Sequence, residues 1–131
     1  MTFSDSGAHV SQIMDASLQT HVLSHWVRDE NALSLEDAVR MMTFDIASNW
    51  EFADRGLLRP GYAADVAVFD ANRVGPQMPE VVTDLPAGAK RLKQKADGFL
   101  ATVVNGEVVL RNGEHTGALP GQLLRGPLAN R

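Results

Sequence analysis

Two strand-forming runs separated by Asn105-Gly106 set the strongest limit on what this chain can fold into. The runs, FLATVV and EVVLR, are rich in β-branched side chains. Asn-Gly readily adopts the two positive φ angles of a type I′ turn, whose twist matches that of paired antiparallel strands. The sequence therefore predicts a β-hairpin over residues 99–111.

The first half of the chain carries helical patterns. Apolar side chains recur every four residues at Leu18, Val22 and Trp26, which predicts a helix over residues 17–29. A second helix is predicted near residues 35–49, where Ser34 and Asp37 match a capping box. Its apolar positions are Leu35, Ala38, Val39, Met42 and Ile46. Helices therefore precede strands, which indicates an α+β domain or pieces of two neighbouring architectures.

The remaining segments give weaker signals. Residues 66–69 form a short apolar run between two aspartates, which predicts a strand buried on both faces. Residues 71–98 hold three prolines and the basic patch KRLKQK, so we expect a long surface connection with some short local structure. We interpret the patch as a solvated face, with an anionic substrate or a lipid headgroup as the alternative ligand. The tail from His115 onward is expected to lie over the surface.

Size and composition narrow the class of protein. A length of 131 residues indicates one domain. The net charge of −4 argues against a nucleic-acid partner, because phosphate binding depends on cationic contacts. The absence of cysteine removes disulfides and thiolate metal ligands. No apolar run reaches the ~18 residues of a membrane span, and the first residues show no signal-peptide pattern. We expect a cytoplasmic protein without a membrane partner.

The densest group of reactive side chains is SDSGAH, residues 4–9. A serine nucleophile needs a base and an orienting group, which His9 and Asp5 could supply to Ser4 or Ser6. Residues this close in sequence seldom converge on one point, however. Asp5 or His9 could also bind a metal, although one short segment rarely supplies a full ligand set. Composition alone favours a polar turn.

A second candidate site lies on the first predicted helix. His21 and His25 are four residues apart, so they share a face and could hold one metal ion. No glutamate follows the first histidine, as it would in a zincin-like His-Glu-x-x-His motif. We favour the interpretation that His21 and His25 are ordinary interface or surface residues.

Six segments of the chain, in order, resemble a known family. They are SDSGAH, SHWVRDE, LSLEDAVRMMT, DRGLLRPGYAADVAVFD, DLPAGAKRL and VVNGEVVLRNGEHTGALPGQLLR. Together they resemble the carboxy-terminal part of the N-acyl-D-amino-acid deacylases (D-aminoacylases), in the metal-dependent amidohydrolase superfamily. The pattern from Gly61 to Asp70 is typical of many amidohydrolases, whereas DLPAGAKRL and HTGALPGQLLR are more particular to the deacylases.

The resemblance implies an α/β fold. In that superfamily a (β/α)8 barrel is joined to a small β-sandwich built from both chain ends. Residues 1–56 would be the last βα unit of the barrel, with strand 8 and two helices. Residues 57–131 would be the carboxy-terminal strands of the sandwich.

The resemblance also implies a site and a reaction. Asp5 matches the family's catalytic aspartate, and it would lie at the carboxyl end of a barrel strand, where such enzymes keep their chemistry. Ser4, Gly7, Ala8 and Arg91 are candidate substrate-binding residues. The implied reaction is amide hydrolysis of an N-acyl-D-amino acid with zinc. The family's metal ligands, a His-x-His, further histidines and a cysteine, have no matching positions here. We therefore expect this chain to hold no metal and to be inactive alone.

Two other interpretations remain. The chain could be a non-enzymatic interaction or oligomerisation module derived from an amidohydrolase, or an independent serine hydrolase using Ser4 or Ser6. A lone βα unit would leave apolar helix stripes uncovered. We therefore expect either self-association or packing of the helices back onto the β part.

Overall fold

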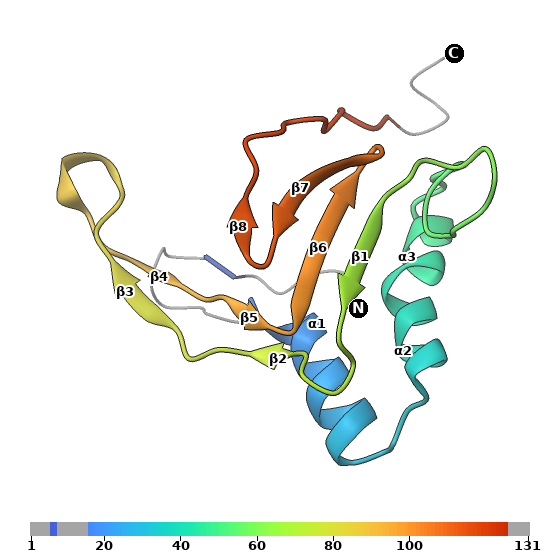
Figure 1. The fold of residues 1–131 in the computed structure, drawn as a ribbon, viewed down its shortest axis with the longest axis horizontal. Helices are drawn as coiled ribbons and strands as arrows, with labels where there is room; N and C mark the ends of the chain where they lie inside the picture. Colours follow the sequence, from blue (N-terminus) through green and yellow to red (C-terminus); the bar gives the residue numbers. More distant parts are fainter. Residues whose placement is uncertain (1–5, 8–15, 126–131) are drawn as a thin grey trace.

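The computed structural model of this chain describes residues 6–7 and 16–125. Helical segments come first and are followed by short strands, all of them paired antiparallel (Figure 1). The helical segments are α1 (Leu18–His21), η1 (Val22–Asp29), α2 (Leu35–Met42) and α3 (Phe44–Asn49). None of the helices in this described part is long and apolar enough to cross a membrane.

The first predicted helix is confirmed, but its hydrogen bonding changes along its length. Segment α1 is α-helical, and η1 is a π-helix that continues directly from it. Val22 and Leu23 are buried, whereas Trp26 is 46% exposed. The predicted apolar stripe is therefore wrong at Trp26. The wider turn of the π-helix shifts later residues around the axis, so the 3.6-residue spacing assumed from sequence no longer holds.

The second predicted helix begins as expected and is interrupted near its middle. The backbone N–H of Asp37 donates to the hydroxyl of Ser34 at 3.0 Å, which confirms the cap. Thr43 breaks the helix into α2 and α3, with φ −124° and ψ −82°. Its hydroxyl donates to the carbonyl of Val39 at 2.7 Å, a local bond that competes with regular helical bonding.

A four-stranded sheet forms the main β layer, in the order β1-β6-β7-β8. Its strands are β1 (Val66–Phe69), β6 (Phe99–Val104), β7 (Glu107–Arg111) and β8 (Glu114–His115). The predicted hairpin is β6–β7, and its turn has positive φ angles at Asn105 (47°) and Gly106 (84°). The tail beyond β8 lies over this turn, where the Asn105 side-chain amide donates to the carbonyl of Pro120 at 2.8 Å.

Strand β1 lies at one edge of the sheet, beside α2 and α3 (Figure 1). Ala67 is exposed and Val68 is 41% exposed. The prediction of a strand buried on both faces is therefore wrong for this chain. Among the described residues β1 pairs with β6 alone, so no second strand bonds to its outer edge.

The predicted surface connection over residues 71–98 is an antiparallel arm that projects from the sheet (Figure 1). At its base β2 (Gly75–Pro76) pairs with β5 (Ala96–Asp97). Further out β3 (Glu80–Val82) pairs with β4 (Arg91–Lys93). A 3-10 turn, η2 (Pro86–Gly88), lies near the tip. Strands of two or three residues are too short to show periodicity in sequence.

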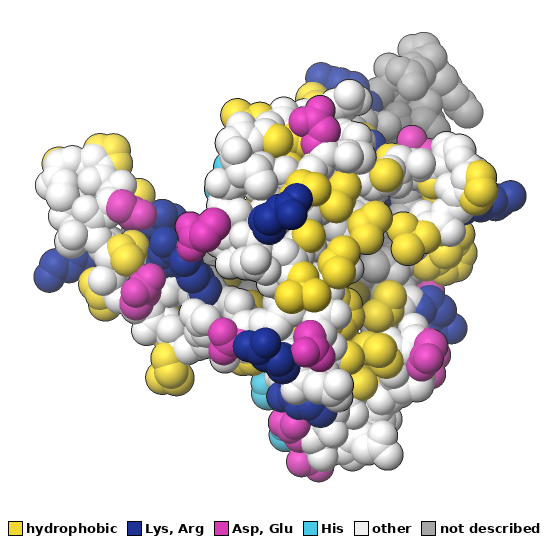
Figure 2. All heavy atoms as spheres, in the orientation of Figure 1, with side chains coloured by type: hydrophobic (Ala, Val, Ile, Leu, Met, Phe, Trp, Pro, Cys, Tyr) yellow, Lys and Arg dark blue, Asp and Glu magenta, His cyan; other side chains and the backbone are white. Residues whose placement is uncertain are grey.

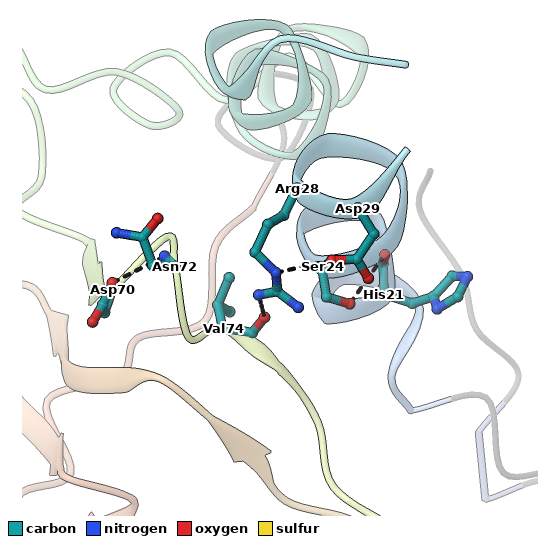
Figure 3. Close-up of polar contacts among 7 residues, drawn as sticks. All are labelled: His21, Ser24, Arg28, Asp29, Asp70, Asn72 and Val74. Atoms are coloured by element: carbon teal, nitrogen blue, oxygen red, sulfur yellow. Dashed lines mark hydrogen bonds and ion pairs between the residues drawn. The ribbon is translucent and has the colours of Figure 1, made fainter. Parts of the chain in front are cut away.

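The core joins the helices to the base of this arm. Its buried residues are Val22, Leu23, Ala38 and Val74. Val74 is 1% exposed, and its carbonyl accepts a hydrogen bond from Arg28 Nη1 at 2.6 Å (Figure 3). The helices therefore fold back on the β part, as one of the two expected arrangements required.

Substituting Gly98 tests this junction. Gly98 has φ +80°, and a Cβ there would lie 2.5 Å from the Val74 nitrogen and 2.6 Å from its Cα. We expect Gly98→Ala to cost about 1–2 kcal/mol for the left-handed backbone and a further 1–3 kcal/mol, roughly, for the clash. Chemical denaturation measures the total loss of unfolding free energy.

Gly61→Ala is the matched control, because Gly61 has φ +89° but no described atom within 4 Å of its Cβ position. Gly61→Ala should lower the unfolding free energy only by the cost of the left-handed backbone. Equal losses of unfolding free energy in the two variants would contradict the close packing of Gly98 on Val74.

Candidate functional site

The predicted catalytic segment lies mostly outside the described residues. This applies to Ser4, Asp5, Ala8 and His9. Gly7 is described, and it is exposed in a turn with φ +87°. No described atom lies within 4 Å of where its Cβ would be. Replacing Gly7 by another residue would therefore strain the backbone, because of its positive φ, without causing a clash with any described atom.

The family-like pattern from Gly61 to Asp70 has a clear structural role around its first aspartate. Asp65 Oδ1 accepts a hydrogen bond from the backbone N–H of Asn105 at 2.8 Å. Its other oxygen, Oδ2, accepts from Arg55 Nη1. The adjacent carbonyl of Ala64 accepts from the Gly106 N–H at 3.0 Å. Asp65 therefore ties the entry of β1 to the β6–β7 turn, which is 40 residues away in the chain.

The electrostatics of Asp65 match this role. Burial on its own would raise the pKa of Asp65, but the Asn105 hydrogen bond and the Arg55 guanidinium together outweigh it. The pKa of Asp65 is therefore lower than usual. The Arg55 side chain is 12% exposed, so the ion pair is partly shielded from water. Asp65 is suited to remain ionised and to accept hydrogen bonds, rather than to exchange protons near neutral pH.

The second aspartate of the pattern builds the turn after β1. Asp70 Oδ1 accepts from the Asn72 N–H at 2.9 Å, and the Asp70 N–H donates to the Gly98 carbonyl at 2.8 Å. Its own carbonyl accepts from the Val74 N–H at 2.8 Å. Figure 3 shows how this turn leads from Asp70 to Val74 beside η1. Both aspartates of the pattern thus position the β layer.

Arg91, a predicted substrate-binding residue, lies on β4 of the arm. Its Nε and Nη2 donate to the two carboxylate oxygens of Asp84, both at 2.6 Å. These hydrogen bonds hold the pKa of Asp84 below its usual value and raise that of Arg91. A substrate carboxylate reaching Arg91 would have to compete with Asp84. The pair closes the tip of the arm across η2.

The basic patch KRLKQK is partly neutralised in the structure. Of its four cations, Arg91 pairs with Asp84, and Lys95 lies 3.3 Å from Glu114. These ion pairs favour the interpretation as a solvated face over that of an anion-binding site. Surface pairs of this kind contribute little to stability.

An apolar groove of about 710 Å³ lies between α2, residues 56–58 and β1. Figure 2 shows hydrophobic side chains gathered on this side of the molecule. Several of them are substantially exposed, including Leu58 at 78%, Leu57 at 41% and Phe44 at 40%. The apolar lining residues are Leu23, Val39, Met42, Phe44, Leu57, Leu58, Val66, Ala67, Phe69 and Phe99. Exposed apolar surface of this kind marks an interaction site more often than an ordinary surface.

Comparison with known proteins identifies the family. A model of the amidohydrolase family matches residues 4–110, most of the chain. The chain belongs to the amidohydrolase family. The predicted family is therefore confirmed. The predicted similarity to deacylases is also confirmed, by the relatives described next.

Two curated relatives of this amidohydrolase chain are deacylases from Alcaligenes xylosoxydans xylosoxydans. An N-acyl-D-aspartate deacylase is 42% identical over 106 residues, which cover 80% of this chain and 19% of the relative. A D-aminoacylase is 36% identical over 103 residues, which cover 79% of this chain and 19% of the relative. The chain thus spans about a fifth of the length of these relatives.

Solved structures of D-aminoacylase share the α/β fold. One crystal structure superposes with a TM-score of 0.62 at 32% identity, covering 78% of this chain and 20% of that protein. Another, of a D-aminoacylase studied for its binuclear metal centre, has a TM-score of 0.61 at 33% identity and the same coverage. The two helical regions and antiparallel strands of this amidohydrolase chain belong to the shared part.

The described residues of this amidohydrolase chain supply no group of three metal ligands, such as a catalytic zinc site requires. Among residues 6–7 and 16–125, no three His, Cys, Asp or Glu side chains come together in a way that could hold a metal ion. The whole sequence lacks cysteine. No catalytic step can therefore be assigned to a metal held by the described part.

Replacing Asp65 tests its structural role. Asp65→Asn removes the negative charge opposite Arg55, and we expect a loss of about 1–2 kcal/mol of unfolding free energy, since solvent screens part of the pair. The effect should depend on pH. Because the pKa of Asp65 is lower folded than unfolded, its stabilisation is complete above the ordinary value of 3.8 and is lost as pH falls through the folded value.

Denaturation curves at pH 7 and pH 3 measure this difference. The gap between the original chain and Asp65→Asn should be largest at pH 7 and should narrow at pH 3. Asp84→Asn serves as the control, because Asp84 also pairs with an arginine, but Arg91 is 44% exposed whereas Arg55 is 12% exposed. Its effect should therefore be smaller. A gap that widened in acid would contradict the proposed role of Asp65.

Proposed function

We propose that this chain is the carboxy-terminal segment of a metal-dependent amidohydrolase that cleaves the amide bond of N-acyl-D-amino acids. The observation that carries the proposal is the 42% identity to an N-acyl-D-aspartate deacylase over 106 residues. The family match begins at residue 4, so it includes Asp5. Coverage of about a fifth of each relative fits a segment of a larger enzyme.

The proposed division of the chain follows the change from helices to strands. Residues 1–56 would close a (β/α)8 barrel, and residues 57–131 would contribute strands to a composite β-sandwich. In support of this division, the helices from Leu18 to Asn49 precede every described strand, of which the first begins at Val66. The core around Val74 would then join the two domains.

Asp5 is proposed as the catalytic proton carrier. A water oxygen attacks the acyl carbon, and its proton passes to the Asp5 carboxylate. As the C–N bond breaks, Asp5 delivers that proton to the departing amine nitrogen. The products are a carboxylate and a free D-amino acid. The described residues include no group of three metal ligands, so activation of the water is not assigned to them.

The substrate-binding proposals concern Ser4, Gly7, Ala8 and Arg91. Gly7 supports close approach of a ligand to the backbone, because its position is open in the described part. Arg91 could bind the substrate carboxylate if it exchanged Asp84 for the ligand, since a guanidinium fork recognises either carboxylate in the same way.

An interaction module is the second candidate function. The exposed apolar groove between α2 and β1 favours it, because large exposed apolar patches often mark a protein interaction surface. In that case the chain would self-associate or bind a partner without catalysing hydrolysis.

An assay with matched variants separates these functions. The gene product that contains this sequence, with any coding sequence upstream of Met1, is incubated with N-acetyl-D-aspartate, and release of the free amino acid is measured. We expect hydrolysis of the D but not the L enantiomer. Asp5→Asn should lower kcat by about 10²–10⁴-fold with little change in KM, because a proton carrier acts in the transition state.

Asp29→Asn makes the same chemical change at an exposed position on η1 and should leave kcat unaltered. The 131-residue chain alone is expected to be inactive. If it hydrolysed the substrate without the preceding sequence, the segment hypothesis would be wrong. If the larger product showed no amidase activity on any N-acyl amino acid, the interaction module would be favoured.

A further inference from the structure

Two histidines lie side by side at the junction of α1 and η1. The ring centroids of His21 and His25 are 4.9 Å apart, and their planes differ by 18°. His21 is exposed and His25 is half-buried. Figure 3 shows the His21 ring directed away from the contact between Arg28 and Val74. The pair therefore lies on a side of the helix that does not take part in this core contact.

The two histidines share a face although the helix type changes between them. An α-helix has 3.6 residues per turn, so residues four apart are offset around the axis. The π-helix, with bonds from residue i to i+5, has a wider turn. The change occurs at Val22, between the two histidines. The bond from the Glu30 N–H to the His25 carbonyl, at 2.8 Å, shows the wider spacing. Residues four apart lie within about 40° of each other around the axis of either helix type, so the two rings can stack.

The ring nitrogens of both histidines are available for a ligand. Within the described residues neither imidazole makes a side-chain hydrogen bond, and their contacts are the stacking described above and an edge contact of His25 with Trp26 at 4.8 Å. A neutral imidazole has one nitrogen lone pair to donate. Two imidazoles on one helix face can therefore supply two donors to one ion once the rings turn out of their stacked arrangement.

We propose that His21 and His25 form a two-imidazole binding site for Cu²⁺ or a similar divalent transition metal. Imidazole nitrogen suits copper, nickel and zinc, whereas magnesium and calcium prefer oxygen ligands. Tetragonal Cu²⁺ accepts two neighbouring nitrogens and completes its shell with water. Affinity should follow the usual order, with Cu²⁺ above Ni²⁺ and Zn²⁺. The inference does not depend on the proposed function.

Trp26 provides a direct readout. Its ring contacts His25, so a bound Cu²⁺ ion should quench its fluorescence. The chain has two tryptophans, and Trp50→Phe removes the other signal. The complete 131-residue chain carrying Trp50→Phe is titrated with Cu²⁺, Ni²⁺, Zn²⁺ and Mg²⁺, and calorimetry measures stoichiometry and affinity. We expect one Cu²⁺ per chain, weaker binding of Ni²⁺ and Zn²⁺, and none of Mg²⁺.

Variants locate the site. His21→Gln and His25→Gln should each weaken Cu²⁺ binding by at least about tenfold, because loss of a ligand costs at least as much as loss of an outer-shell partner. His115→Gln is the matched control, since His115 lies on β8 and its Nδ1 already accepts the Gly117 N–H at 2.9 Å. Circular dichroism verifies that each variant folds.

Binding that is unchanged in His21→Gln and His25→Gln, but lost in His9→Gln or on acetylation of the terminal amine, would place the metal elsewhere and overturn the proposal. Equal quenching by Cu²⁺ in every variant would indicate non-specific association and would also overturn it.

Discussion

Val74 is the residue through which the two halves of the molecule are joined. Its side chain packs with Val22, Leu23 and Ala38 from the helices, and its carbonyl receives Arg28. Gly98, at the start of the returning strand, lies directly against its backbone. Because each contact comes from a different part of the chain, the helices, the arm and the sheet all take their relative positions from this one residue. Because protein cores are closely packed, a change in side-chain volume at this junction should be felt by the helices, the arm and the sheet.

The family-like pattern acquires a physical explanation from these contacts. Its two aspartates bracket β1 and bond to opposite ends of the neighbouring hairpin. Asp65 receives the Asn105 amide at the turn, and the Asp70 amide reaches the Gly98 carbonyl at the other end. The spacing between them matches the length of the strand. A pattern typical of many amidohydrolases thus describes how one strand is fastened to its neighbour. Chemistry in this chain is proposed instead at Asp5, in a different segment.

The features predicted correctly from sequence are those set by neighbouring residues. The Asn105-Gly106 turn and the Ser34 cap depend on φ preferences and on a bond across three residues, so the sequence around them is sufficient. The features missed depend on distant partners or on very short elements. Short local structure was expected over residues 71–98, but not the pairing of its two- and three-residue strands into an arm. The helix break at Thr43 accompanies one side-chain hydrogen bond, and the exposure of β1 depends on what lies beside its edge.

The candidate site shows the same division. Asp65 could be noticed in the sequence as part of a pattern, but its partners Arg55 and Asn105 are 10 and 40 residues away and could not be assigned without coordinates. Arg91 was expected to bind a ligand from its motif, and its pairing with Asp84 across the tip of the arm was not foreseen. The assignment of Asp5 depends on resemblance to relatives, because isolated residue types leave several chemistries open.

The separation between β1 and its partner has a consequence for biosynthesis. Phe69 pairs with Phe99, so β1 leaves the ribosome about thirty residues before the strand it needs. At roughly 5–20 residues per second, β1 stays unpaired for seconds while its apolar side chains are already in water. The nascent chain therefore presents a strand-like apolar segment during translation, and chaperones that hold such segments would act on it before the sheet forms.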